Sequence, residues 1–415
     1  MTALAPAPGI WPTPTVPSAC PAAVSRRILF IEPNDDGTVG GSHQVLYDLA
    51  RGLDGTGYQP VVLFNQQNSF VARLRASGIE VHVFDGPWTR ERTVIRTGNR
   101  IRQAAMLLEA IARRARFLRR HDIALVHVNG TPQTAQDDWL PAARLTRTPI
   151  IATCAGNLSF DVASRLELRL MRAFDRVLPV SEHVAAQARR FGYDASRITM
   201  IHPGIDLDAL RARLSRDPAT VRRELVVDAE TMLVSMVGNL RRWKGQHVAI
   251  EALARMAPSD RMRVKLIFAG SASPADRGYE EELHQLVARH SLQRQVTFLG
   301  RRDDAAEIMA ASDVVLHASI DPEPFGLVLL EGMALGRAVV ASANGGPAEI
   351  LDDASGLRYP PGDADSLADH LRILLADPTL RRSMGEAGRR RAEQFAIGRT
   401  VRAAVAVYGE VLDAT

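Results

Sequence analysis

The sequence is poor in lysine and cysteine and has no long hydrophobic run. Only Lys244 and Lys265 are lysines among its 51 basic residues, a bias most simply explained by an arginine-rich genome. Two cysteines, Cys20 and Cys154, cannot build a disulfide framework or a metal knuckle, which fits a reducing compartment. No apolar run approaches the ~20 residues of a membrane span. We therefore expect a cytoplasmic globular protein.

The charge is distributed unevenly along the chain. Residues 1–24 carry six prolines and no charge, so we interpret them as a disordered leader and not as a signal peptide, which needs a basic start and an apolar core. Residues 1–200 have a net charge of +7 and residues 201–415 a net charge of −3, which together give the +4 of the whole chain. This asymmetry indicates two domains with different partners.

Short apolar runs alternate with helical patterns, which predicts parallel sheets covered by helices on both faces. The expected strands are 26–33, 58–64, 79–84, 123–129, 148–154, 175–180 and 197–202, then 231–238, 263–270, 295–300, 312–319 and 336–343. The clearest helical patterns are 42–53, 99–121, 181–191, 245–257, 278–290, 365–376, 378–394 and 400–412. Between the two sets of strands, the polar and proline-marked residues 203–222 are typical of a linker.

We therefore predict an α/β protein with two Rossmann-like, doubly wound domains that face each other across a central cleft. The N-terminal domain is expected at 25–203 and the C-terminal domain at 204–395. A C-terminal helix at 396–415 is expected to return to the N-terminal domain. In such sheets, ligands bind at the carboxyl ends of the strands, beside helix N-termini.

Two acids flank the start of a predicted helix in "EPFGLVLLEGMALG". Glu323 lies in a proline-bounded loop, and Glu331 lies two turns into the helix that Gly326 opens. The first turn of that helix offers unpaired N–H groups and the positive end of a dipole, which suit an anion. A ligand could touch both acids and leave its phosphates between them. The alternative is a capping glutamate followed by an ordinary solvated acid.

Two further turns have the composition of phosphate-binding loops. In "VSMVGNLRRWKGQHVAIEAL", Arg241, Arg242 and Lys244 lie between a buried strand and a helix, where they could bind a diphosphate or merely be solvated. In the first strand–helix turn, Gly40 and Gly41 permit a close backbone approach, although a plain turn is nearly as good an explanation. Neither turn has the P-loop or the dinucleotide pattern.

Taken together, these residues resemble the family 4 retaining glycosyltransferases of the GT-B fold over nearly the whole chain after the leader. The most specific part is Glu323-x7-Glu331. The supporting motifs, in the family's order, are the Gly40–Gly41 loop, "VSEHV" at 180–184, "IHPGID" at 201–206, "GNLRRWKGQ" at 238–246 and "GGPAEI" at 345–350. One such motif would be weak evidence, whereas six in order are strong evidence.

The resemblance implies that the C-terminal domain holds a nucleoside-diphosphate sugar and the N-terminal domain holds the acceptor. Glu331 would accept hydrogen bonds from the ribose, and Glu323 would contact the donor sugar. Lys244 would neutralise the departing diphosphate and act with Glu323 as the catalytic pair. The other implied donor-binding residues are Gly40, Gly41, Asn239, Arg242, Arg301, Phe325, Gly326 and Leu327. The resemblance also implies front-face attack with retention of configuration.

Two positions depart from the family pattern. Asn239 stands where many relatives have an arginine, so Arg241 or Arg242 would have to supply a second cation, if one is needed. Ala155 stands where many have a histidine. His127 and His43 are nearby candidates for its role, but we favour a structural role for each.

We expect no metal and no cofactor, because fixed N–H groups and a lysine can stabilise the leaving diphosphate and the sequence shows no convincing metal-ligand cluster. Among donors, a UDP-sugar is slightly favoured. Alternatives are a non-hydrolysing sugar-nucleotide epimerase, a phosphorylase, or a non-catalytic nucleotide-sugar-binding protein. No nucleic-acid partner is expected, since no basic patch interleaved with aromatic residues appears.

The segment 99–121 has the pattern of a basic amphipathic helix. Leu108, Ile111, Ala115 and Leu118 form one stripe, and Arg113, Arg116 and Arg120 lie opposite. Such a helix can lie on an anionic membrane surface, although packing on its own sheet with a solvated arginine face is the favoured alternative. Membrane binding at the inner face would suit a lipid-linked glycan acceptor in surface polysaccharide synthesis.

Overall fold

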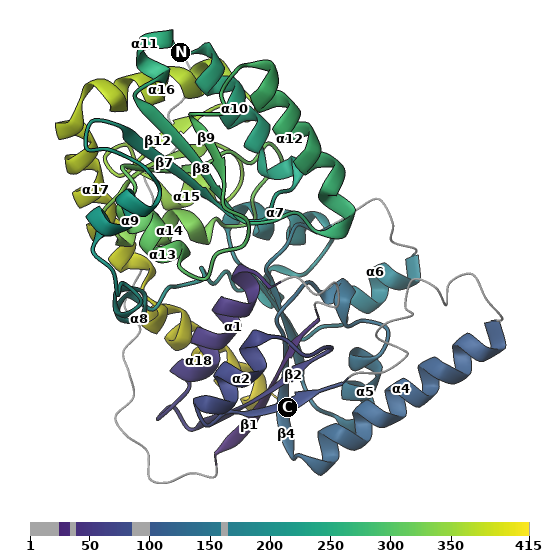
Figure 1. Cartoon of the computed structure of the whole chain (residues 1–415). Coiled ribbons are helices and arrows are strands. Elements are labelled where there is room, and N and C mark those ends of the chain that lie inside the picture. Colours follow the sequence, from purple (N-terminus) through teal and green to yellow (C-terminus); the bar gives the residue numbers. More distant parts are fainter. Residues whose placement is uncertain (1–24, 34–38, 85–99, 159–164, 415) are drawn as a thin grey trace, which may run out of the picture.

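Two parallel sheets organise the chain. The computed structural model describes residues 25–33, 39–84, 100–158 and 165–414, so the leader lies outside the described residues. Each half of the chain is built on a six-stranded, all-parallel sheet with helices on both faces (Figure 1). The predicted α/β class with two doubly wound halves is thereby confirmed.

The N-terminal sheet has the strand order β3-β2-β1-β4-β5-β6. Its strands are β1 (Arg26–Glu32), β2 (Tyr58–Phe64), β3 (Glu80–Val83), β4 (Ile123–Val128), β5 (Ile150–Cys154) and β6 (Arg176–Pro179). The central strands are buried because their runs are apolar on both faces, and Leu29 lies in register with Val61 on one side and Val126 on the other. The helices of this half are α1 (Gly41–Gly52), α2 (Ser69–Ala76), α4 (Arg100–Arg120), α5 (Trp139–Thr146), α6 (Arg165–Met171) and α7 (Glu182–Arg190), with short 3-10 turns η2 (Pro132–Thr134) and η3 (Ala195–Arg197).

The C-terminal sheet has the order β12-β11-β10-β7-β8-β9. Its strands are β7 (Met232–Val237), β8 (Val264–Ala269), β9 (Val296–Phe298), β10 (Val314–His317), β11 (Ala338–Ser342) and β12 (Leu357–Tyr359). Its helices and 3-10 turns are α9 (Pro218–Glu224), η4 (Arg242–Lys244), α10 (Gln246–Arg255), α11 (Pro258–Arg261), η5 (Pro274–Asp276), α12 (Arg277–Arg289), α13 (Ala305–Ala311), α14 (Leu327–Ala334), α15 (Pro347–Ile350), α16 (Ala364–Ala376), α17 (Pro378–Ala392) and η6 (Glu393–Phe395). Several helices begin at an aspartate that caps free N–H groups, as Asp363 does for α16.

One expected strand does not form, the expected linker contains helices, and one strand was not anticipated. Residues 197–202 are not a strand: Ile198 forms one isolated bridge with Val177, and the next bridge is incomplete because its partner on β6, Pro179, has no N–H to donate. The expected linker at 203–222 contains α8 (Leu207–Ala212) and most of α9. The short strand β12 was not anticipated, because three residues between Gly356 and Pro360 give too short an apolar run to recognise.

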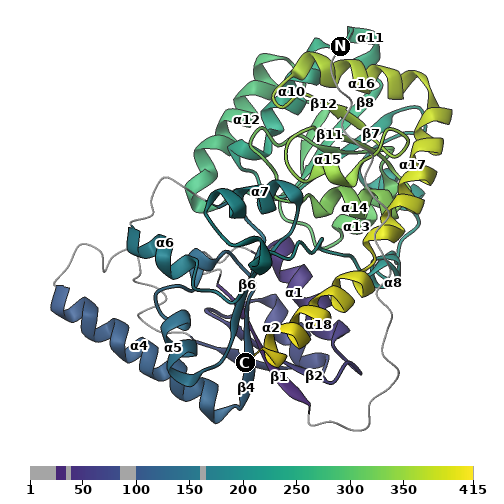
Figure 2. The same cartoon turned by 180° about the vertical axis from the view of Figure 1, so that it is seen from behind.

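The last helix, α18 (Ile397–Asp413), crosses from the C-terminal half to the N-terminal half (Figure 2). It packs against α1, and its buried Val407 and Tyr408 join the core formed with β1 and β2. The Tyr408 hydroxyl lies 2.7 Å from Nδ1 of His127 on β4. None of the described helices combines the length and the apolarity needed to cross a bilayer. The domain limits proposed from the sequence stay a prediction.

Candidate functional site

The loop between β10 and α14 carries Glu323, and the "GGPAEI" segment holds its backbone. The Gly346 N–H donates to the Glu323 carbonyl at 2.9 Å, and the Glu323 N–H donates to the Asn344 carbonyl at 3.3 Å. Gly345 has a φ of +77°, and a Cβ placed there would lie 2.2 Å from the Glu323 carbonyl oxygen. Only glycine fits this contact without a backbone shift. The motif at 345–350 therefore supports the loop that positions Glu323.

The Glu323 carboxylate lies in a cluster of three donors. Its Oε2 accepts hydrogen bonds from Lys244 Nζ at 2.6 Å, His317 Nε2 at 3.1 Å and Ser319 Oγ at 3.1 Å. All three bonds reach the same oxygen, and the described residues give Oε1 no hydrogen bond. The residue is only 8% exposed. The cluster thus fixes the carboxylate through one oxygen and leaves the other available to a ligand.

Burial and charge act in opposite directions on this carboxyl group. Burial raises the pKa of Glu323, but the Lys244 ammonium and the hydrogen bond from His317 outweigh it and hold the pKa well below its usual range. The group is therefore ionised at neutral pH. A carboxylate in this state accepts hydrogen bonds and cannot act as a general acid.

The turn η4 brings Lys244 to this loop. The Ile320 N–H donates to the Trp243 carbonyl at 2.8 Å, which fixes the turn against the chain that leaves β10. Lys244 Nζ lies 4.1 Å from the centroid of the Trp243 ring, a cation–π contact that keeps its stem in place. The Lys244 side chain is 24% exposed, so its ammonium group faces both Glu323 and solvent.

The N-terminus of α14 meets the N-terminus of α1 from the other half of the chain. Gly326, with a φ of +110°, precedes α14, and Leu327 is its first residue. A Cβ on Gly41 would lie 2.8 Å from Cδ1 of Leu327, so the two helix ends lie close together and a larger residue at Gly41 would require the Leu327 side chain to move. Two clusters of free N–H groups thus lie on either side of the boundary between the halves, as an anion-binding cleft requires.

Glu331 opens onto a pocket that both halves of the chain line. The pocket has a volume of about 270 Å³, including the solvent at its mouth, and its lining residues are Gln44, Asp48, Ile205, Asp206, Ala209, Leu210, Arg213 and Glu331. Burial raises the pKa of Glu331 to about 7, with Arg213 opposing and Asp48 adding to the rise. Burial also raises the pKa of Asp48 to about 6. The two acids of Glu323-x7-Glu331 therefore lie in different electrostatic surroundings.

Glu349 joins the two halves beside Phe325. Its carboxylate accepts from the backbone N–H groups of Glu182 at 2.9 Å and His183 at 3.2 Å, at the start of α7. The same carboxylate lies 3.1 Å from Nε2 of His202, whose ring stacks on Phe325 with centroids 5.5 Å apart. A residue of the C-terminal half thus caps a helix of the N-terminal half, next to the Glu323 loop.

The remaining residues predicted for the donor site are Asn239, Arg242, Arg301 and Gly40. Asn239 follows β7 and is half-buried, and its carbonyl accepts from Gln246. Arg242 is exposed, pairs with Glu282 and lies over the Tyr279 ring, so it does not join Lys244 in the Glu323 cluster. Arg301 is exposed in the loop after β9, and Gly40 is exposed before α1.

The two histidines considered as substitutes for Ala155 are core residues, in line with the structural role we favoured. His127 is 1% exposed and lies between the hydroxyls of Tyr408 and Thr153, each 2.7 Å away, and burial lowers its pKa to about 3. His43 is buried and stacks on Phe64.

The sequence analysis missed several residues of the site. His317 and Ser319 bind Glu323, whereas Asp48 and Arg213 share the pocket of Glu331, and Glu349 spans the boundary. His317 could have been recognised from the sequence, because it is the last residue of the apolar strand that leads into the Glu323 loop. Ser319 is only four residues from Glu323, but a lone serine gives no signal of its own. Asp48, Arg213 and Glu349 lie more than a hundred residues from their partners, so local sequence gives no indication of those contacts.

Two Rossmann-like halves that meet at a helix N-terminus, with a lysine–carboxylate pair beside it, have the arrangement expected of the GT-B fold. Comparison with solved structures agrees. HepE of Anabaena in complex with UDP and glucose superposes with a TM-score of 0.76 and is 26% identical, over 93% of this chain and 100% of that one. A glycosyltransferase of Rickettsia africae shares the fold with a TM-score of 0.78 at 19% identity, covering 94% of this chain and all of that one.

The chain belongs to glycosyltransferase family 4. The model described as Glycosyltransferase Family 4 matches residues 39–209, and that described as Glycosyl transferases group 1 matches residues 218–391. The D-inositol 3-phosphate glycosyltransferase of Corynebacterium aurimucosum is 36% identical over 209 residues, or 49% of each chain, so the aligned region spans about half of that relative. The protein of the same name from Kineococcus radiotolerans is 29% identical over 90% of this chain and 91% of its own.

Proposed function

We propose that the protein is a retaining glycosyltransferase that moves a hexose-type sugar from a nucleoside-diphosphate sugar to a hydroxyl acceptor. The observation that carries the proposal is the Lys244–Glu323 pair below the N-terminus of α14. One oxygen of the Glu323 carboxylate accepts hydrogen bonds from protein groups. The other can accept a hydrogen bond from a hydroxyl of the donor sugar. A UDP-sugar is favoured as donor, which the UDP-glucose complex of HepE supports.

The lysine and the helix terminus together suit the leaving group. Departure of a nucleoside diphosphate places negative charge on its oxygens, and fixed N–H groups and an ammonium group stabilise that charge more than they stabilise the ground state. The backbone N–H groups of Phe325, Gly326 and Leu327 are the proposed donors at the helix end. We accordingly propose that transfer needs no metal and no cofactor, and the test is unchanged turnover in the presence of EDTA.

The state of Glu323 favours front-face attack over double displacement. A double displacement needs a carboxylate free to bond the sugar carbon and a second group that protonates the leaving oxygen. Glu323 keeps one oxygen free, but its low pKa leaves it ionised, so it has no proton to give to the leaving oxygen. Glu331 faces a separate pocket, and we propose that it accepts hydrogen bonds from the ribose there. The departing phosphate is then the proposed base for the acceptor hydroxyl.

Two acceptor classes are in contention. The relatives named D-inositol 3-phosphate glycosyltransferase favour an inositol phosphate, which the positively charged N-terminal half would attract. A glycan acceptor, including a lipid-linked one in surface polysaccharide synthesis, is supported by α4. Arg113, Arg116 and Arg120 are exposed on that helix, and Leu108 is 67% exposed. Ala115 and Leu118, by contrast, are buried against the sheet, so only the first half of the stripe is available to a membrane.

A donor-binding assay tests the proposal most directly. Calorimetric titration with UDP-glucose, GDP-mannose and ADP-glucose identifies the nucleotide, and release of UDP with each acceptor class identifies the reaction. Glu331→Ala should abolish donor binding, whereas Glu386→Ala, on the surface of α17, should leave it intact. Donor binding that is unchanged by Glu331→Ala would refute the proposed site.

Flotation with vesicles that contain anionic phosphatidylglycerol tests the membrane partner separately. Binding should be lost when Arg113, Arg116 and Arg120 are changed together to glutamine. If the parent protein does not float, or if the triple variant floats equally well, α4 is a surface helix only and the soluble acceptor is favoured.

A further inference from the structure

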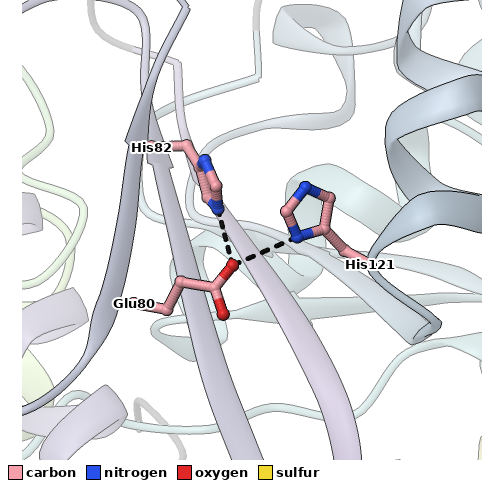
Figure 3. A group of neighbouring side chains, drawn as sticks. All are labelled: Glu80, His82 and His121. Atoms are coloured by element: carbon pink, nitrogen blue, oxygen red, sulfur yellow. Dashed lines mark hydrogen bonds and ion pairs between the residues drawn. The ribbon is translucent and has the colours of Figure 1, made fainter.

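A second cluster of side chains lies at the edge of the N-terminal sheet. Glu80 and His82 are two residues apart on β3, so both side chains point to the same face of that strand. His121 follows the last residue of α4 and lies over the same face (Figure 3). Two elements far apart in sequence therefore bring two imidazoles and one carboxylate together.

The three donor atoms converge on one point. Glu80 Oε1 lies 2.7 Å from His82 Nε2 and 3.1 Å from His121 Nδ1 (Figure 3). The donor atoms of all three residues lie within 4.8 Å of one another. In one tautomer, each imidazole donates a hydrogen bond to the carboxylate. Its other tautomer would present a lone pair to the same point instead.

The surrounding residues hold the cluster in this arrangement. Arg27, near the start of β1, pairs with the other oxygen of Glu80 and leaves Oε1 to the histidines. The His121 ring stacks on Phe117 with centroids 4.2 Å apart, and the His82 ring meets Phe117 edge-on at 5.0 Å. Second contacts of this kind orient metal ligands in proteins.

We propose that Glu80, His82 and His121 form a binding site for a divalent transition-metal cation of the zinc class. Two imidazole nitrogens and one carboxylate oxygen suit zinc and its neighbours, whereas magnesium and calcium prefer oxygen ligands only. Three protein ligands leave a fourth position for water. Because Arg27 partly neutralises the carboxylate, we expect weaker binding than at a site with an uncompensated acid.

The site is separate from the donor cleft. Glu80 begins β3, Arg27 lies near the start of β1, and His121 lies two residues before β4. These are the amino ends of parallel strands, whereas donor binding is assigned to the carboxyl ends. A bound cation would tie the outermost strand of the sheet to the end of α4, so its expected effect is on the stability of the N-terminal half and not on transfer.

Zinc titration of the full chain tests the proposal. The protein is dialysed against a chelator and then against metal-free buffer. Zinc chloride is added in calorimetry and in thermal unfolding, and cobalt chloride in visible spectroscopy. The variants are His82→Gln and His121→Gln. The matched control is His290→Gln, at the residue that directly follows α12. UDP-glucose binding by each variant serves as the measure of correct folding.

We expect one bound zinc equivalent in the parent and in His290→Gln, a melting temperature raised by about 5 °C at a hundredfold excess over Kd, and cobalt absorption typical of tetrahedral coordination. His82→Gln and His121→Gln should each lower zinc affinity at least tenfold while donor binding is retained. The proposal is overturned if zinc leaves the melting temperature of the parent unchanged, or if both variants bind zinc as the parent does. Glu80 and its histidines would then be a hydrogen-bonded network only.

Discussion

Replacement of Lys244 by glutamine tests the central contact of the site. The variant removes the ammonium group that lies 2.6 Å from Glu323 Oε2 and keeps a side chain of similar length. His317 and Ser319 remain as donors to the same oxygen. The carboxylate would then lack the charge that holds its pKa low, so burial should raise that pKa.

The geometry sets the size of the effect. Unit charges separated by 2.6 Å attract by ~6 kcal/mol at an effective dielectric constant of about 20. Desolvation offsets much of this attraction, and removing one partner of a fully buried pair costs about 3–5 kcal/mol of unfolding free energy. Because the Lys244 side chain is 24% exposed, water replaces part of the contact, so we expect a loss of about 2 kcal/mol.

Lys244→Gln should lower the rate of sugar transfer by more than its loss of folding stability can explain. If Lys244 stabilises the leaving diphosphate, its loss should lower kcat by about 10²–10³-fold, the range seen when one preorganised donor is removed. Turnover is measured as UDP release at a temperature where circular dichroism shows the variant to be folded. Lys265→Gln is the matched control, since Lys265 is the other lysine of the chain. It lies on β8 and donates to the backbone carbonyl of Arg294.

A double-mutant cycle with Glu323→Gln separates the two roles. If the pair is only structural, Lys244→Gln lowers the free energy of unfolding and leaves kcat near the parent value. That result would refute our reasoning on the leaving group. A coupling energy near zero between the two positions would refute the contact itself.

Three further outcomes are expected. UDP-glucose affinity, measured by calorimetry, should fall by up to about tenfold as the pH is lowered from 8 to 6. The reason is that Glu331, with a pKa of about 7, accepts ribose hydrogen bonds best when it is ionised. Glu331→Gln should make the affinity nearly independent of pH over this range. Glu349→Ala should cost about 1–2 kcal/mol of unfolding free energy and raise the KM for donor, because a helix cap across the cleft is lost, and Glu349→Gln should cost less. Tyr408→Phe should cost about 1–2 kcal/mol in urea unfolding, because buried His127 loses its Nδ1 partner.

Buried parallel strands were the most predictable feature of the fold. Runs such as Ile28–Ile31 and Val314–Leu316 are apolar at consecutive positions, which only a strand covered on both faces can bury. The segment 197–202 mixes apolar and polar residues and lies beside β6, where Pro179 has no N–H to donate, so it forms only one isolated bridge. Composition predicts a strand, whereas the hydrogen-bonding capacity of its neighbours decides whether the strand forms.

The candidate site was predictable only as far as its contacts are local. The loop at Glu323 and the helix that follows are recognised from nearby residues. The partners of Glu349 at Glu182, His183 and His202 are about 150 residues away, and no local pattern indicates them. The same holds for the metal-type cluster: the spacing of Glu80 and His82 predicts a shared face, but nothing local places His121 above it.

The two acids of the motif show why spacing alone does not assign a role. Glu323 and Glu331 are the same residue type, eight positions apart and both removed from bulk water. Lys244 and His317 hold the pKa of the first low, whereas burial beside Asp48 raises that of the second to about 7. The first is therefore a permanent acceptor next to the proposed leaving group, and the second changes charge near neutrality in a pocket shared by both halves. Burial is the main cause of the raised pKa of Glu331, whereas Arg213 and Asp48, which come from outside the C-terminal sheet, act on that pKa in opposite directions.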